Sequence, residues 1–255
     1  MEKNYLIKIE YDGSDFSGWQ IQPGVRTVQG VLEDALSTFC GISIKINGTS
    51  RTDAGVHALG QCATFSGDFA IPPENLMKAA NNYLAGGMNA LNRVGDVRII
   101  SIKEVPMDFH ARFCCKGKTY KYIIDNSENA DVFSRKYKYH IIDKLNLEEM
   151  KKAAKKVCGT HDFKSFEASG SNPRETTVRT VSDIEIRRNE NDVIIEVTGD
   201  GFLYNMVRII VGTLVEVGLG KRMADSVEDI IEARDRTKAG HTAPAEGLYL
   251  KGIYF

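Results

Sequence analysis

The sequence predicts an α+β protein made of two halves, each with the element order β-α-β-β-α-β that is typical of ferredoxin-like folds. Two observations support this. Apolar residues alternate over short runs, as in half-buried strands, and recur at helical spacing between those runs. The order of the runs in the first half also repeats in the second, with negligible sequence identity between them. A length of 255 residues allows two ordinary domains, and we place them at 1–106 and 107–255.

In the first half, strands are predicted where apolar and polar residues alternate, and helices where apolar residues recur every three or four positions. The helix expected at 27–39, for example, has Val28, Leu32 and Leu36 on one side. In order, the predicted elements are a strand at 5–11, a helix at 27–39, strands at 42–46 and 61–66, a helix at 73–84 and a strand at 97–104.

The second half repeats this order and adds one helix. Its predicted elements are a strand at 119–125, a helix at 147–158, strands at 178–187 and 193–198, a helix at 203–217 and a final strand at 248–255. The additional helical pattern, at 226–233, precedes the last strand and is expected to decorate the fold.

The composition, with 42% hydrophobic and 26% charged residues, is that of an ordinary globular protein. No apolar run approaches the ~20 residues that cross a bilayer, and the chain begins with a strand pattern instead of a signal peptide. We therefore expect a cytoplasmic protein without a membrane partner. Five cysteines without Cys-x-x-Cys spacing, and histidines without partners at ligand spacing, argue against a disulfide framework and a metal site.

A net charge of −1 does not indicate a nucleic-acid-binding protein, but the cations are concentrated locally. Lysines alternate with Tyr120 and Tyr122 in residues 116–122, and a second basic run occupies 135–140. One interpretation is a solvated edge strand that lysines protect from pairing. The other is an electrostatic track for an RNA backbone, and this feature alone leaves both open.

The strongest candidate for chemistry lies in the loop between the strands predicted at 42–46 and 61–66. Asp53 follows Arg51 by two residues and precedes His57 by four. Loops between strands are a usual place for reactive side chains, and a neighbouring Arg keeps a carboxylate ionised, as nucleophilic or base chemistry requires. The alternative is a turn in which Asp53 accepts hydrogen bonds from nearby backbone N–H groups. His57 is expected to bond within the loop.

The segment Arg-Thr-Asp-Ala-Gly-Val-His at residues 51–57 resembles the active-site motif of the tRNA pseudouridine synthases, specifically the bacterial TruA family. Further blocks resemble this family in the same order along the chain, at residues 11–20, 27–29, 109–113, 118–122, 161–166, 205–208 and 243–250. The resemblance therefore covers nearly the whole chain. It implies two α+β halves whose antiparallel sheets meet around a central cleft that holds the active site.

The resemblance also implies roles for five residues. Asp53 would be the catalytic carboxylate, and Arg208 would pair with it and keep it ionised and oriented. Tyr120 would stack on the uracil, and Leu248 would form the floor of its pocket. Arg51 would aid base flipping and contact the RNA backbone. Whether Asp53 attacks C1′, attacks C6 or removes a proton from C2′ stays open.

The implied reaction is the isomerisation of uridine to pseudouridine in the anticodon stem-loop of tRNA, at positions 38, 39 and 40, by a homodimer without metal or organic cofactor. Two alternatives are a non-catalytic RNA-binding module of paired ferredoxin-like halves and a family member with another RNA target. The chain departs from the family pattern at two places. Ser50 replaces a glycine before Arg51, where a positive φ would strain a serine, and residues 85–93 resemble an insertion that would affect substrate range.

Overall fold

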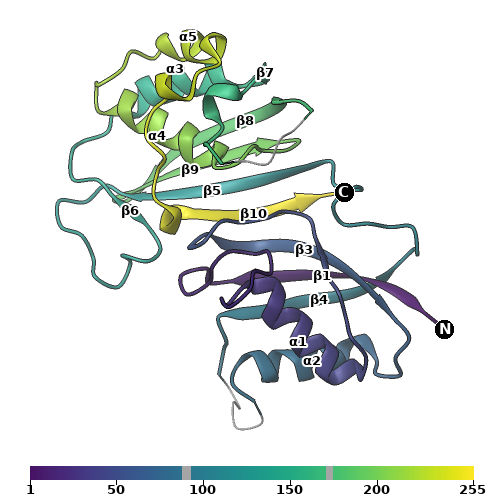
Figure 1. Ribbon diagram of the computed structural model, residues 1–255. Helices are drawn as coiled ribbons and strands as arrows, with labels where there is room; N and C mark the ends of the chain where they lie inside the picture. The colour runs from purple at the N-terminus through teal and green to yellow at the C-terminus, as the bar shows by residue number, and fades with distance from the viewer. Residues whose placement is uncertain (88–92, 171–174) are drawn as a thin grey trace. The chain divides into compact units, whose positions relative to one another are not determined.

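The computed structural model of the protein describes residues 1–87, 93–170 and 175–255. The region expected to be an insertion, 85–93, therefore lies largely outside the described residues. Internal contacts divide the chain into two units, residues 1–116 with 250–255 and residues 117–249 (Figure 1). Each unit combines helices with a mainly antiparallel sheet, which confirms the predicted α+β class.

The first unit extends beyond residue 106, where we placed the boundary from sequence. The Asn4 side-chain amide donates to the carbonyl oxygens of Pro106 (2.9 Å) and Phe109 (2.8 Å). The N–H of Lys116 donates to the carbonyl oxygen of Tyr254 at 2.8 Å, which holds the end of the chain in the same unit. Hydrogen bonds between residues far apart in sequence leave no periodic pattern, so the sequence did not reveal this division.

The first unit is built around a long central strand. Its elements are β1 (Lys3–Tyr11), α1 (Val28–Cys40), β2 (Asn47–Gly48), β3 (His57–Gly67), α2 (Pro73–Leu84) and β4 (Val97–Val105). Strand β1 pairs antiparallel with both β3 and β4, and the two helices contact each other. Alternate residues of β1 are buried, among them Tyr5, Ile7 and Ile9, so one face of this strand belongs to the core.

The strand predicted at 42–46 is wrong. Two backbone N–H groups that a strand would use for its ladder donate to side chains of helix α1. Ile44 donates to Ser37 Oγ (2.9 Å), and Ile46 donates to Glu33 Oε1 (3.1 Å). Pairing with β3 is limited to the two residues of β2. The alternating apolar residues of this segment are buried without a strand: Ile44 and Ile46 are 0% and 3% exposed.

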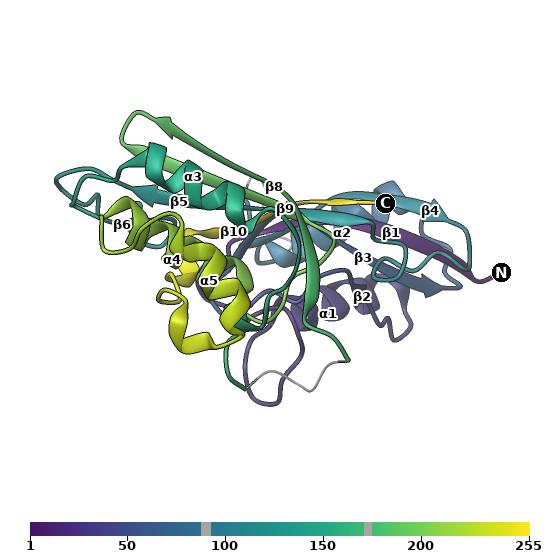
Figure 2. The ribbon, with the colours of Figure 1, turned by 90° about the horizontal axis from the view of Figure 1, so that it is seen from above.

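The second unit contains the remaining helices. Its elements are β5 (Gly117–Asp125), β6 (Tyr139–His140), α3 (Leu147–Val157), β7 (Gly159–Asp162), β8 (Val178–Asn189), β9 (Asp192–Gly199), α4 (Met206–Gly218), α5 (Ser226–Ala233) and the start of β10 (Leu248–Tyr254). Strands β5, β9, β8 and β7 follow one another in antiparallel order, whereas β6 joins β5 in parallel. Figure 2 shows α3 running along β8, which it contacts. Helix α4 is buried on almost every side.

No helix in the described part of the chain is long and apolar enough to cross a membrane. Within the same residues, no three His, Cys, Asp or Glu side chains are grouped as metal ligands would be. All five cysteines are free thiols, and burial raises the pKa of Cys40 and of Cys62 to about 11. These two thiols are therefore protonated at neutral pH and poor nucleophiles.

Candidate active site

The loop that carries Asp53 is held by hydrogen bonds on both sides of that residue. The Thr52 carbonyl accepts from the N–H of Trp19 (3.0 Å), and the Thr52 hydroxyl bonds to the hydroxyl of Tyr11 (2.7 Å). On the other side, the N–H of Val56 donates to the Asp53 carbonyl at 3.2 Å and closes a turn. The partners come from the core of the first unit, so the backbone that positions the Asp53 carboxylate is fixed.

Gln61, a fully buried residue of β3, also holds the same loop through hydrogen bonds. Its Nε2 donates to the carbonyl oxygen of Ser50 at 2.7 Å, and its Oε1 accepts from the N–H groups of Cys62 and Ser50. Sequence reasoning missed these bonds, although a glutamine in a strand expected to be largely buried was a signal for them. Among the described non-glycine residues, positive φ angles occur at Glu190, Asn205 and Arg234. Ser50 therefore carries none of the expected strain.

His57 bonds to the loop after β1, and not within its own loop as expected. Its ring is 2% exposed, and Nδ1 accepts a hydrogen bond from the N–H of Gly13 at 3.0 Å. The same Nδ1 lies 3.2 Å from Oδ1 of Asp12, which belongs to the same loop as Gly13. Its function in the structure is to tie the loop after β1 to the start of β3.

Two charged side chains of this loop are not fully buried. Arg51 is exposed, and the side chain of Asp53 is half-buried. A half-buried carboxylate on a rigid backbone is accessible to a substrate and loses little freedom when one binds, which suits covalent or base catalysis. The exposed guanidinium two residues away is a group that can bind a phosphate or another anion.

Arg208 lies in the first turn of α4, where the structure orients its guanidinium through acceptors of the second unit. Its Nε donates to the carbonyl oxygen of Ala243 (2.7 Å), and its Nη1 donates to Asn205 Oδ1 (2.8 Å). The N–H of Ala243 in turn donates to the Arg208 carbonyl at 3.1 Å. The side chain is half-buried and is held in a defined direction, unlike a solvated surface cation.

Tyr120 and Leu248 belong to the same unit as Arg208. The Tyr120 ring on β5 is 8% exposed and meets the ring of Phe202 edge-on, with centroids 5.4 Å apart. Leu248 opens β10 and is 5% exposed. Close to Leu248, a Cβ on Gly247 would lie 2.6 Å from the Tyr122 ring, so only glycine permits the segment to pack this closely.

Tyr122 has a structural role. Its ring is fully buried, and its hydroxyl donates to the carbonyl oxygen of Pro244 at 2.7 Å. Burial, together with the nearby carboxylate of Glu246, raises its pKa well above the usual range, so it stays protonated as a donor. It thereby fixes the segment that runs from Ala243 to Leu248.

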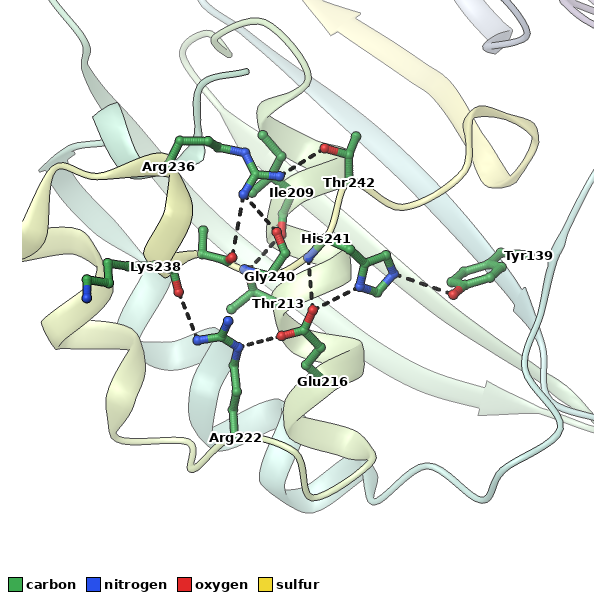
Figure 3. A network of polar contacts seen from close by, with 11 residues as sticks. Tyr139, Ile209, Thr213, Glu216, Arg222, Arg236, Lys238, Gly240, His241 and Thr242 are labelled. Atoms are coloured by element: carbon green, nitrogen blue, oxygen red, sulfur yellow. Dashed lines mark hydrogen bonds and ion pairs between the residues drawn. The ribbon is translucent and has the colours of Figure 1, made fainter. Parts of the chain in front are cut away.

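Glu216 is the centre of a polar network that sequence reasoning missed (Figure 3). Its Oε1 accepts from the N–H (2.9 Å) and Nδ1 (3.0 Å) of His241, and its other oxygen accepts from Arg222. Burial by itself would raise the pKa of Glu216, but these hydrogen bonds outweigh it and lower the pKa to about 2. The signal was a single carboxylate in a helix of mostly apolar residues.

Because the pKa of Glu216 falls below its usual value of 4.5 on folding, the ionised carboxylate stabilises the protein above about pH 4.5. This contribution should be lost as the pH falls from about 4.5 to about 2. We expect Glu216→Gln to lower the free energy of unfolding at pH 6, with a difference from wild type that shrinks toward pH 3. Urea unfolding at both pH values measures it, and an equal difference at each would contradict the assignment.

The structure thus places Arg51 and Asp53 in one loop of the first unit, and Tyr120, Arg208 and Leu248 in the second unit. Arg208 and Leu248 are linked through the residues from Ala243 to Gly247. The two sets differ in the chemical groups that they offer. The first offers a carboxylate and a cation, and the second offers an aromatic ring, an apolar surface and an oriented guanidinium.

Comparison with known proteins places this chain among RNA-modifying enzymes. Residues 7–114 and 153–255 match the family model described as tRNA pseudouridine synthase, so most of the chain lies within the family pattern. The chain belongs to the tRNA pseudouridine synthase family. The enzymes of this family are isomerases that convert uridine to pseudouridine.

Individual relatives are similar in sequence to this chain over their full length. "tRNA pseudouridine synthase A" of Acetivibrio thermocellus is 47% identical over 253 residues, which cover 99% of this chain and 100% of that protein. The protein of the same name from Thermoanaerobacter sp. is 48% identical with the same coverage. "tRNA pseudouridine synthase A 2" of Clostridium tetani is 45% identical over 257 residues and covers both chains fully. A solved Cbf5–Nop10–Gar1 complex contains a chain with a TM-score of 0.34 and 12% identity, covering 83% of this chain and 54% of that one.

Proposed function

We propose that this protein converts uridine to pseudouridine in the anticodon stem-loop of tRNA, at positions 38, 39 and 40, in the cytoplasm. The observation that carries the proposal is the Asp53 loop. In a chain that matches tRNA pseudouridine synthases from end to end, the half-buried carboxylate stands on a backbone fixed by Trp19, Tyr11 and Gln61. A binding module would need no carboxylate held in this way.

The reaction is an isomerisation. The bond between C1′ and N1 breaks, the uracil turns, and a bond forms between C1′ and C5, while C5 loses its proton and N1 gains one. No electron is gained or lost, so the chemistry requires no redox cofactor. A uracil stacked in a helix is out of reach, and flipping it into a pocket costs a few kcal/mol of unstacking.

We assign the catalytic role to Asp53 and infer that Arg208 pairs with it, which would keep the carboxylate ionised during the reaction. The assignment is supported by the half-burial of both side chains and by the two acceptors that direct the Arg208 guanidinium. An ionised Asp53 could attack C1′ or C6, or remove the C2′ proton, and each of these routes uses the same carboxylate. Arg51, exposed beside it, would contact the RNA backbone while the base is flipped.

We further propose that Tyr120 stacks on the freed uracil and that Leu248 forms the floor of its pocket. An aromatic ring replaces part of the stacking that the base loses on flipping. For these residues to act with Asp53, two ferredoxin-like halves would meet around a central cleft. The order β1-α1-β2-β3-α2-β4 in the first unit is that of one ferredoxin-like half.

A homodimer is part of the proposal. With a net charge of −1, one copy of the chain offers limited attraction to RNA, and a second copy would extend the basic surface that a tRNA contacts. Sedimentation of the free protein and of its tRNA complex would measure the number of chains in each. A complex that contains a single protein chain at all concentrations would remove this part of the proposal.

The proposed positions are tested by mapping pseudouridine in tRNA transcripts after incubation with the protein. We expect new pseudouridine at uridines in positions 38, 39 and 40, and none in transcripts where cytidine replaces those uridines. Pseudouridine elsewhere in the tRNA, or in another RNA class only, would support a family member with a different target. Binding without any pseudouridine would support the non-catalytic alternative.

A further inference from the structure

One face of α4 is covered by the segment of residues 239–244. Arg208, Gly212 and Glu216 are four residues apart and therefore share that face. Ala243 exchanges hydrogen bonds with Arg208, and His241 bonds to Glu216. A Cβ on Gly212, between them, would collide with the carbonyl oxygen of His241. The segment thus lies in direct contact with the helix from the Glu216 end to the Arg208 end.

Further bonds hold this segment at both ends. The N–H of Gly240 donates to the Thr213 hydroxyl at 2.9 Å, and Arg236 donates to the Gly240 carbonyl at 2.9 Å and to the Thr242 hydroxyl at 3.0 Å. At the other end, the hydroxyl of Tyr122 donates to Pro244, as described above. Ala243 lies between these anchors, so the place of its carbonyl oxygen depends on how firmly the segment is fixed.

The bonds of His241 differ from the others because they combine backbone and ring. Its N–H and its Nδ1 both meet the same oxygen of Glu216, which fixes the direction of the peptide as well as the ring. The ring also meets the Tyr139 ring edge-on, with its Nε2 3.4 Å from the hydroxyl (Figure 3). His241 therefore sets the path of the backbone that leads through Thr242 to Ala243.

We propose that His241 and Glu216 are positioning residues for Arg208. They hold the Ala243 carbonyl where it accepts from Nε, and so fix the direction of the guanidinium. The inference rests on the proposed function, in which Arg208 acts on the catalytic carboxylate. A guanidinium held by fewer acceptors samples more directions, and catalysis is sensitive to misplacements of about 1 Å. The chemical step should suffer, whereas tRNA affinity should not.

The test compares His241→Ala and Glu216→Gln with wild type in steady-state pseudouridine formation. We expect kcat to fall about 10- to 100-fold, as for other residues that orient a catalytic group, with KM for tRNA unchanged within about threefold. Glu228→Gln is the matched control, because Glu228 pairs with Lys156 at 2.8 Å on the surface of the same unit. It should retain the wild-type rate.

A double-mutant cycle separates positioning from a general structural effect. In an Arg208→Lys background the Nε donor is absent, so Glu216→Gln and His241→Ala should lower kcat little further. His241→Asn retains a side-chain N–H and should recover most of the rate lost in His241→Ala. This variant also replaces His241→Ala in the test if the alanine variant folds poorly. Wild-type rates in the single variants, or fully additive losses with Arg208→Lys, would overturn the inference. A wild-type protein that forms no pseudouridine would instead overturn the proposed function.

Discussion

Asp53→Asn is expected to lower the single-turnover rate of pseudouridine formation by at least about 10⁴-fold, because an amide can neither attack as an anion nor remove a proton. The substitution is nearly isosteric. The hydrogen bonds that fix the loop come from the Thr52 carbonyl and hydroxyl, the Ser50 backbone and the Asp53 carbonyl, and all of these are retained. The dissociation constant for tRNA should therefore stay within about threefold of wild type.

Asp68→Asn is the matched control for this experiment. Asp68 lies in the same unit, is 70% exposed and pairs with the amino terminus at 2.8 Å. Its replacement should leave both rate and affinity unchanged. An Asp53→Asn protein that still forms pseudouridine at a tenth of the wild-type rate or faster would remove Asp53 from the catalytic role.

Arg208→Ala is expected to lower kcat by about 10²- to 10³-fold, the usual cost of removing one charge or donor that stabilises a reacting group. Arg208→Lys should recover part of this loss, since it keeps the charge but not the planar donor geometry that meets Ala243 and Asn205. KM for tRNA should change little in either variant. The informative measurement is whether each substitution changes kcat or KM.

The control for Arg208 is an arginine of the same unit that lies on the surface. Arg187 is 44% exposed and is 3.6 Å from Glu185 in an ion pair. Arg187→Ala should leave kcat unchanged, because surface pairs of this kind contribute little. If Arg208→Ala raised KM while kcat stayed at the wild-type level, Arg208 would be a contact to the RNA backbone.

The sequence predicted the regular elements well wherever local periodicity decides them. The helices expected at 73–84 and 226–233 are α2 and α5 to the residue. Prediction failed at 42–46, where side chains of α1 take the backbone N–H groups, and short β6 and β7 were not expected. Side-chain-to-backbone bonds and strands of two to four residues leave no periodic signal.

The residues of the candidate site could likewise be predicted only in part. The sequence pattern pointed to Asp53 as a carboxylate beside a cation, and the resemblance to the family supplied Tyr120, Arg208 and Leu248. Neither revealed Gln61 under the loop or the bond between His241 and Glu216, because these join residues 11 and 25 positions apart. Residues that react can be read from a motif, whereas the residues that hold them in place are determined by the fold.

Whether this protein forms pseudouridine through Asp53 is decided by tritium release from tRNA labelled with [5-³H]uridine, in the presence of a metal chelator. Only the formation of a bond to C5 expels that tritium. We predict release by the wild-type protein that reaches a plateau set by the uridines at positions 38, 39 and 40, and none after Asp53→Asn. Tight binding of tRNA by the wild-type protein without release of tritium would contradict the proposed pseudouridine formation.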